Sequence, residues 1–105
     1  MTLQWSLRAR RELDALYRYY HKLSPKVAIY MHNEVIDEAE RLIDWPDLGQ
    51  IDPDLTGFRY VVRSLVILNG LYRLVYFTDK ETVVIHSLWA CRQNPKKKFD
   101  HKRNK

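Results

Sequence analysis

The chain has little cysteine, glycine and proline, and it has no long apolar run. Its 105 residues include one Cys, three Gly and four Pro. The single cysteine, Cys91, excludes an internal disulfide framework and a cysteine-rich zinc site, and it is typical of a reducing compartment. The N-terminal segment lacks an apolar signal core, and no apolar run approaches the ~20 residues of a membrane helix. We therefore expect a cytoplasmic protein without a membrane partner.

Hydrophobic residues make up 46% of the chain and charged residues 30%, which is typical of one folded globular domain. The charge is unevenly distributed. Residues 92–105 hold seven basic residues and one acidic residue, a net charge of +6, whereas residues 1–91 hold eleven basic and twelve acidic residues, a net charge of −1. We expect one domain over residues 1–95 and a basic tail over residues 96–105, which is either solvated and disordered or in contact with an anion such as a nucleic acid.

Two helices are predicted in the first half of the chain. Ser6 is a suitable N-cap, and apolar residues recur after it at helical spacing up to Leu23. Ser24-Pro25 ends this helix and begins another, because serine caps helices and proline is tolerated at the first helical position. The second apolar stripe consists of Ala28, Met31, Val35, Ala39 and Leu42. This helix ends at Trp45-Pro46, and the short connection predicts an antiparallel helical hairpin.

The second half of the chain predicts strands. Residues 46–57 are rich in Pro, Gly and Asp and predict an extended loop. Residues 58–68, 71–77 and 82–89 are rich in β-branched and aromatic residues, and Asn69-Gly70 is typical of a tight hairpin turn. We expect an α+β fold in which the helical hairpin packs on a small antiparallel sheet, joined by a short N-terminal strand containing Leu3 and Trp5.

Alternation assigns the strand residues to two faces of the sheet. In the last strand it places Val83, Ile85 and Ser87 opposite Val84, His86 and Leu88. Arg59, Arg63 and Arg73 lie on the predicted strands, and Arg92 follows the last one. An arginine on a strand is costly unless it is solvated or paired, so these residues predict a wet, positively charged sheet face or ion pairs with acidic helix residues.

The order of these elements and motifs resembles the RelE/ParE superfamily, the toxins of bacterial type II toxin–antitoxin systems. The segments that carry the resemblance are Pro46-Asp47-Leu48-Gly49, Gly57-Phe58-Arg59, Tyr72-Arg73-Leu74-Val75-Tyr76 and Arg92-Gln93-Asn94-Pro95. The resemblance covers nearly the whole chain. It implies the α+β fold described above, growth inhibition and plasmid stabilisation as biological roles, and neutralisation by a cognate antitoxin.

The resemblance implies two alternative activities. ParE-like members inhibit DNA gyrase and have no known catalytic residues, whereas RelE-like members are ribosome-dependent endoribonucleases that cut mRNA. The ParE-like branch is favoured, because many of its members close the last strand with the Arg92–Pro95 pattern. In addition, Phe99 occupies the place of the tyrosine found in RelE-like toxins, and it has no proton to give. Whether the chain is an enzyme stays open.

If the chain is a ribonuclease, its catalytic residues are Arg73, Arg92 and His86. The two arginines match family positions and would stabilise the charge that develops on phosphorus, and His86 would act as acid or base. A single histidine on a strand is, however, more often a packing or surface residue. The residues expected to contact a nucleic acid or another target are Arg59, Arg63, Arg73, Arg92, Lys96, Lys97, Lys98 and Phe99.

The expected partners are the antitoxin and either DNA gyrase or the ribosome with its mRNA. Trp45 and Trp89 are candidate anchors for the antitoxin, since tryptophan dominates many interfaces, and Trp5 is expected in the core. No metal ion and no cofactor are expected. A third alternative is a non-toxic nucleic-acid-binding domain, supported by the basic tail alone.

Overall fold

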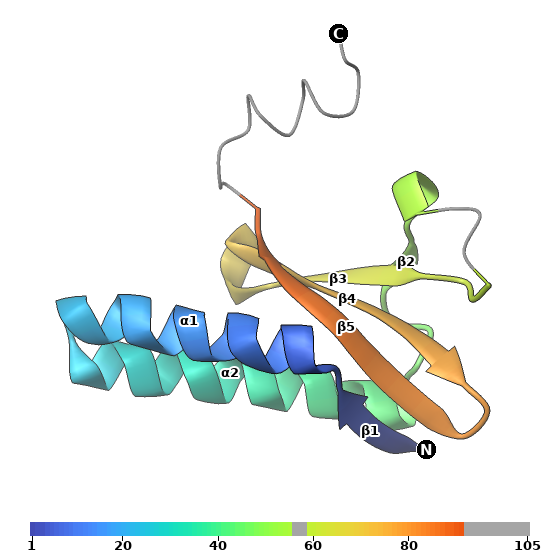
Figure 1. Ribbon diagram of the computed structural model, residues 1–105, viewed down its shortest axis with the longest axis horizontal. Coiled ribbons are helices and arrows are strands. Elements are labelled where there is room, and N and C mark those ends of the chain that lie inside the picture. Colours follow the sequence, from blue (N-terminus) through green and yellow to red (C-terminus); the bar gives the residue numbers. More distant parts are fainter. Residues whose placement is uncertain (56–58, 92–105) are drawn as a thin grey trace, which may run out of the picture.

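The computed structural model describes residues 1–55 and 59–91. The strands and helices follow one another as β1 (Thr2–Trp5), α1 (Leu7–Leu23), α2 (Pro25–Asp44), β2 (Gln50–Ile51), η1 (Pro53–Leu55), β3 (Arg63–Ile67), η2 (Leu68–Gly70), β4 (Tyr72–Asp79) and β5 (Thr82–Ala90). Helices α1 and α2 form a hairpin that lies along one face of a twisted sheet (Figure 1). The predicted α+β fold is confirmed. Neither helix is long and apolar enough to cross a membrane within the described ranges.

Serine caps set the helix boundaries, as predicted. The Ser6 Oγ accepts a hydrogen bond from the Ala9 N–H at 3.0 Å, and the Ser24 Oγ accepts one from the Val27 N–H at 3.3 Å. Pro25 is the first residue of α2, where its missing N–H costs no helical hydrogen bond. The hairpin therefore follows from local sequence chemistry.

The helices contribute an apolar core that faces the sheet. All five residues of the predicted α2 stripe are buried. In α1 the buried residues are Ala9, Leu13 and Leu16, whereas Leu23 is 69% exposed, because the tip of the hairpin projects beyond the sheet (Figure 1). Trp5 is partly buried and packs against this core, in agreement with its predicted place.

The sheet has five strands in the order β1-β5-β4-β3-β2. The pairs β3–β4 and β4–β5 are antiparallel, as predicted for the three strand segments. Strand β2 also pairs antiparallel with β3, which was not predicted. Strand β1 joins the sheet as predicted, and it pairs with β5 in parallel, so the sheet is mixed. Past β1, the Ser6 hydroxyl bonds the His86 carbonyl at 2.8 Å, and Glu12 accepts the Leu88 N–H at 2.7 Å. The start of α1 therefore covers an open edge of β5.

The strand predicted over residues 58–68 was too long. Only Arg63–Ile67 pairs with β4, and the predicted loop 46–57 contains the short strand β2 and the 3-10 turn η1. The β3–β4 connection is η2, in which Leu68 and Asn69 each have φ of 54° and Gly70 has φ of 89°. The Asn-Gly signal therefore located the turn correctly, but a third residue takes a positive φ.

The alternation predicted for the last strand is wrong beyond Ile85. Tyr76 pairs with Ile85 and its neighbour Val75 pairs with Ser87, so His86 is an extra residue in β5. Such a bulge exchanges the two faces of the strand beyond it. Leu88 therefore joins the core beneath the helices, although strict alternation assigned that place to Ser87.

Candidate functional site on the outer face of the sheet

The sheet face opposite the helical hairpin carries arginines beside aromatic rings. Arg73 and Trp89 are directly paired across β4 and β5, and the guanidinium carbon of Arg73 lies 4.9 Å from the Trp89 ring centroid. This stacking depends on the bulge at His86, since strict alternation would have placed Trp89 on the opposite face. The structure therefore joins a predicted target-binding residue to a predicted antitoxin-binding residue.

Arg73 is held by a carboxylate that the sequence analysis missed. Its Nη1 lies 3.2 Å from Asp52 Oδ2, and the side chain of Asp52 is only 3% exposed. The same Oδ2 accepts the Ser64 hydroxyl at 2.8 Å. A buried arginine–carboxylate pair keeps both charges compensated, so the positive charge of Arg73 is already engaged within the chain.

Asp52 is positioned by the backbone around it. Its N–H donates to the Val62 carbonyl at 2.9 Å, and its Oδ1 accepts the Asp54 N–H at 3.0 Å at the start of η1. Strand β2 ends one residue earlier, so the carboxylate turns toward β3 and β4. Because residues 46–57 resemble an ordinary Pro/Asp loop, no periodic pattern distinguishes Asp52 from its neighbours. The one available signal is that a strand arginine requires a partner.

A pocket of about 420 Å³ opens beside this ion pair. Its walls are residues 48–54 together with Ser64, Leu65, Val66 and Arg73. The wall is therefore formed by the segment after α2, which includes β2, together with residues of β3 and Arg73 of β4. It presents the edge of the Arg73–Asp52 pair and the exposed Val66 side chain, which suits contact with a partner better than enclosure of a small ligand.

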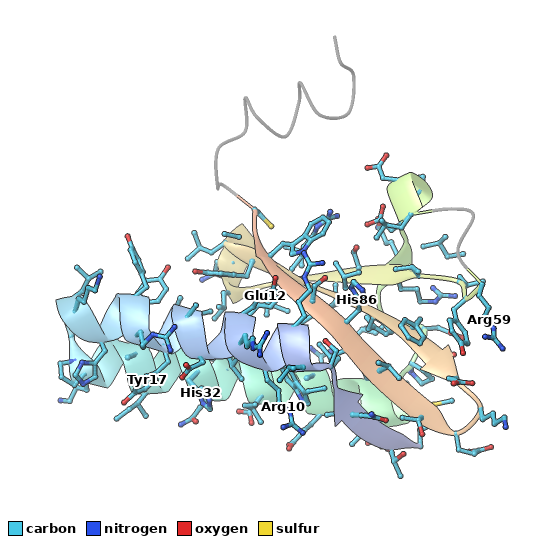
Figure 2. The ribbon with its side chains drawn as sticks, in the orientation of Figure 1. Arg10, Glu12, Tyr17, His32, Arg59 and His86 are labelled. Atoms are coloured by element: carbon cyan, nitrogen blue, oxygen red, sulfur yellow. The ribbon has the colours of Figure 1, made fainter. Side chains whose placement is uncertain are left out.

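A second aromatic and cationic group lies farther along the same face. The rings of Tyr60 and Phe77 are stacked with centroids 4.5 Å apart, and the Arg59 guanidinium lies 5.4 Å from the centroid of Tyr60. The Tyr60 hydroxyl also donates to Asp79 at 3.1 Å. Arg59 is exposed at the right of Figure 2, so its charge faces solvent.

Arg63 lies on β3 and contacts the loop after α2. Its Nη1 donates to the Gly49 carbonyl at 2.8 Å, and its Nη2 lies 3.5 Å from the exposed Asp47 carboxylate. The fully buried Tyr76 bonds the same loop: its hydroxyl donates to the Pro46 carbonyl at 2.7 Å and accepts the Gly49 N–H at 2.8 Å. Burial raises the pKa of Tyr76, against the lowering effect of the Gly49 N–H.

The Pro46–Gly49 motif is thus a clamp between α2 and the sheet. A Cβ on Gly49 would lie 2.7 Å from the Ser64 carbonyl oxygen and 2.8 Å from Tyr76 Cε1. No side chain fits there, so the glycine is required by close backbone approach. The packing of the loop against the sheet therefore explains the glycine of the Pro46–Gly49 segment, one of the segments that carry the family resemblance.

The other predicted site residues are dispersed or lie beyond the described ranges. His86 is on the bulge, and its Nδ1 lies 3.2 Å from the Ser87 hydroxyl. Trp45, which ends α2, is 64% exposed. Arg92, Lys96, Lys97, Lys98 and Phe99 lie outside the residues that the structure describes. In residues 1–55 and 59–91 there is no cluster of three or more potential metal ligands.

Comparisons with a family profile and with solved structures both point to toxins of toxin–antitoxin systems. The profile of the ParE toxin of type II toxin–antitoxin system, parDE, matches residues 3–95. Among solved structures, a chain described as "Chromosomal ParDE TA system from P. aeruginosa" has a TM-score of 0.73 at 20% identity, covering 88% of this chain and 97% of that one. The isolated E. coli RelE toxin has a TM-score of 0.52 at 19% identity, covering 99% and 98%. Curated proteins yielded no match.

Proposed function

The chain belongs to the family of ParE toxins of type II toxin–antitoxin systems, and we propose that it acts in the bacterial cytoplasm by inhibiting DNA gyrase. The observation that carries the proposal is the family match, which spans residues 3–95 of 105. In this proposal the chain is a toxin that works by binding, and residues 1–95 form its functional domain.

The state of Arg73 supports binding rather than RNA cleavage. A ribonuclease needs free positive charge at the phosphate in the transition state. The guanidinium of Arg73 is instead compensated by the buried Asp52 carboxylate and covered by Trp89. Within the described residues, His86 lies on the bulge with the Ser87 hydroxyl as its bonded neighbour. This arrangement offers a rigid, patterned surface to a protein target.

The antitoxin is proposed to use the exposed Trp45 as an anchor. A tryptophan with 64% of its surface in water loses much apolar area on complex formation, which is a strong driving force at interfaces. Trp89 is half-buried under Arg73, so it would contribute mainly through that stacked pair.

A RelE-like ribosome-dependent endoribonuclease is the second candidate. It is favoured by the exposed Arg59 beside the Tyr60–Phe77 stack, because cations next to aromatic rings suit single-stranded RNA. The two candidates differ in their target, so one pair of assays separates them.

Supercoiling of relaxed plasmid by DNA gyrase, measured with the purified chain, tests the first candidate. We expect inhibition that a co-purified antitoxin reverses. Mapping of RNA 5′ ends after induction tests the second. Unaffected supercoiling together with new ribosome-dependent mRNA ends would overturn the gyrase proposal and support the nuclease.

Matched cation variants identify the contact surface in the same assays. Arg59→Ala is expected to weaken inhibition, because it removes an exposed charge from the outer sheet face. Lys80→Ala removes another exposed charge, at the β4–β5 turn, and is expected to leave inhibition unchanged. Equal effects of the two variants would contradict the assignment of the outer face to the target.

A further inference from the structure

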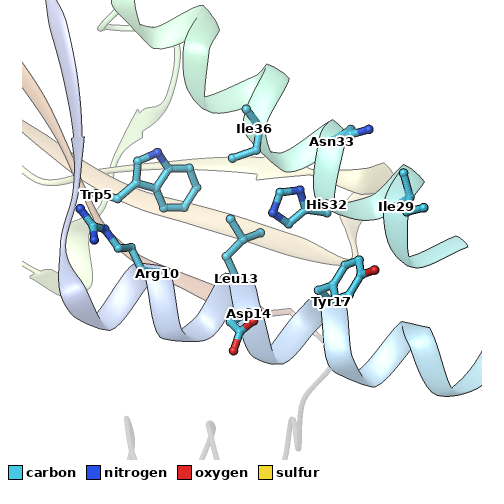
Figure 3. A pocket seen from close by; sticks show the side chains of 9 residues that line it. All are labelled: Trp5, Arg10, Leu13, Asp14, Tyr17, Ile29, His32, Asn33 and Ile36. Carbon is cyan, nitrogen blue, oxygen red and sulfur yellow. The ribbon is translucent and has the colours of Figure 1, made fainter. Parts of the chain in front are cut away.

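A groove of about 530 Å³ runs along the seam between α1 and α2 (Figure 3). Its lining from α1 comprises Arg10, Leu13, Asp14 and Tyr17, and its lining from α2 comprises Ile29, His32, Asn33 and Ile36, with Trp5 at one end. In Figure 2, Arg10, Tyr17 and His32 lie on the side of the hairpin away from the sheet. The groove is therefore separate from the outer sheet face, with the core between them.

The floor of the groove is apolar and aromatic. The rings of Tyr17 and His32 meet edge to face with centroids 6.0 Å apart, and the Trp5 indole closes the end near Arg10. Ile29 lies on the rim and is 51% exposed. An exposed apolar seam with polar residues at its rim is typical of a surface that binds another protein.

The two helices that border the groove carry opposite charge. Helix α1 has five basic and two acidic residues, a net charge of +3, and α2 has two basic and five acidic residues, a net charge of −3. The hairpin ion pairs lie within single helices, and their members are Arg8–Glu12, Arg18–Asp14 and Arg41–Glu38. Arg10, Arg11, Asp37 and Glu40 are exposed and form no salt bridge with another described residue.

These unpaired charges lie at one level of the hairpin. Arg10 and Ile36 line the same groove, Arg11 and Asp37 follow them in sequence, and Glu40 lies one turn beyond Ile36 on the same side of α2. A face with a basic stripe, an apolar seam and an acidic stripe is complementary to its own copy. A twofold axis parallel to the helices places each α1 over the other copy's α2, with basic residues over acidic ones.

We propose that this seam is the interface of a homodimer in which the helical hairpins of two copies pack face to face as a four-helix bundle. The 17 residues of α1 span about 25 Å and two helices are about 20 Å wide, so each copy offers on the order of 500 Å². The total of about 1,000 Å² is at the lower limit of specific interfaces, so we expect a reversible dimer.

Sedimentation equilibrium of the full chain, purified without any partner, tests the proposal. We expect a concentration-dependent rise from the monomer mass of 12.7 kDa to twice that value. A chain that stays monomeric throughout the micromolar range would overturn the proposal. If the seam were then protected from hydrogen exchange only in a complex with the antitoxin, its occupant would be the antitoxin.

Charge variants test the pairing of α1 with α2. Arg10→Glu/Arg11→Glu and Asp37→Lys/Glu40→Lys should each weaken dimerisation by about tenfold or more, because each places like charges opposite one another. An equimolar mixture of the two variants should form a heterodimer, and the fourfold variant should dimerise again. Undiminished dimerisation of the double variants would contradict this arrangement. It would also be the result if α1 packed on α1 of the other copy.

An apolar variant with a matched control tests the seam itself. Ile29→Glu puts a charge into the interface and should leave the chain monomeric. Val61→Glu alters a side chain that is 61% exposed and does not line the groove, and it should leave the dimer intact. Circular dichroism of both variants checks that they fold, so that a loss of dimerisation is not a loss of structure. Equal dimerisation of the two variants would place the interface elsewhere.

Discussion

The outer face of the sheet and the solvent face of the helical hairpin both carry arginines among aromatic rings, yet they treat charge differently. On the outer face of the sheet, Arg73 has Asp52 and Trp89 within the chain. On the other face, Arg63 pairs across the strands with the core residue Tyr76, and it has Gly49 and Asp47 as partners. On the hairpin, Arg10 and Asp37 are exposed and have no ion-pair partner among the described residues.

The difference follows from burial. A charge that loses its water must be compensated inside the fold, because its desolvation is unfavourable. A solvated charge has no such desolvation cost and can pair with an external partner. Arg73 and Arg63 therefore contribute to the stability of this chain, whereas the exposed charges of the hairpin, like that of Arg59, are available for recognition. Substitutions at Asp52, at Tyr76 and on the hairpin face test this contrast through the free energy of unfolding.

Removal of the carboxylate beneath Arg73 should have the largest effect. Asp52→Ala leaves a mostly buried guanidinium and the Ser64 hydroxyl without their acceptor, and we expect a loss of about 2–3 kcal/mol in urea unfolding. Asp52→Asn keeps an oxygen for the Asp54 N–H and should lose less. The double variant Asp52→Ala/Arg73→Met should lose less than the sum of its single variants. Strict additivity would contradict a coupled pair.

Loss of the clamp hydroxyl should have an intermediate effect. Tyr76→Phe leaves the Gly49 N–H and the Pro46 carbonyl without this partner, at a cost of about 1–2 kcal/mol at neutral pH. Burial raises the pKa of Tyr76, and likewise that of Tyr72, above the ordinary value of 10.0. The unfolded chain therefore releases these protons first as the pH rises, so stability is complete below pH 10.0 and falls above it. Unfolding at several alkaline pH values should show a shallower fall for Tyr76→Phe; an unchanged slope would contradict the assignment.

Substitutions on the hairpin face should have the smallest effect on folding. Arg10→Ala and Asp37→Ala remove exposed, unpaired charges, and each should change the free energy of unfolding of the monomer by less than about 0.5 kcal/mol. Measurement at a concentration where the chain is monomeric excludes any effect of association. A loss comparable to that of Asp52→Ala would show that these charges are structural.

The local signals of the chain were sufficient for the helical hairpin. Serine at position 6 and Ser24-Pro25 act through neighbouring atoms, and the apolar stripe of α2 is buried at every predicted position. The overall α+β arrangement followed from these elements and from the three strand segments. Its family resemblance is confirmed by the match over residues 3–95.

The candidate site was only partly predictable. Arg73 was recognised from its strand, but its partner Asp52 lies 21 residues earlier in a loop without periodicity. The bulge at His86 has no sequence signature of its own, because it arises from the register between β4 and β5. Without the bulge, neither the burial of Leu88 nor the stacking of Trp89 on Arg73 could be deduced.

Caps, turns and apolar spacing depend on contacts among near neighbours. The order of the elements and the inward face of each helix could therefore be predicted from the sequence. The partners of Arg73 and Tyr76, the parallel pairing of β1 and the seam groove depend on contacts between distant segments. Those contacts exist only after packing has brought the segments together, because burial is what makes each polar group require a particular partner.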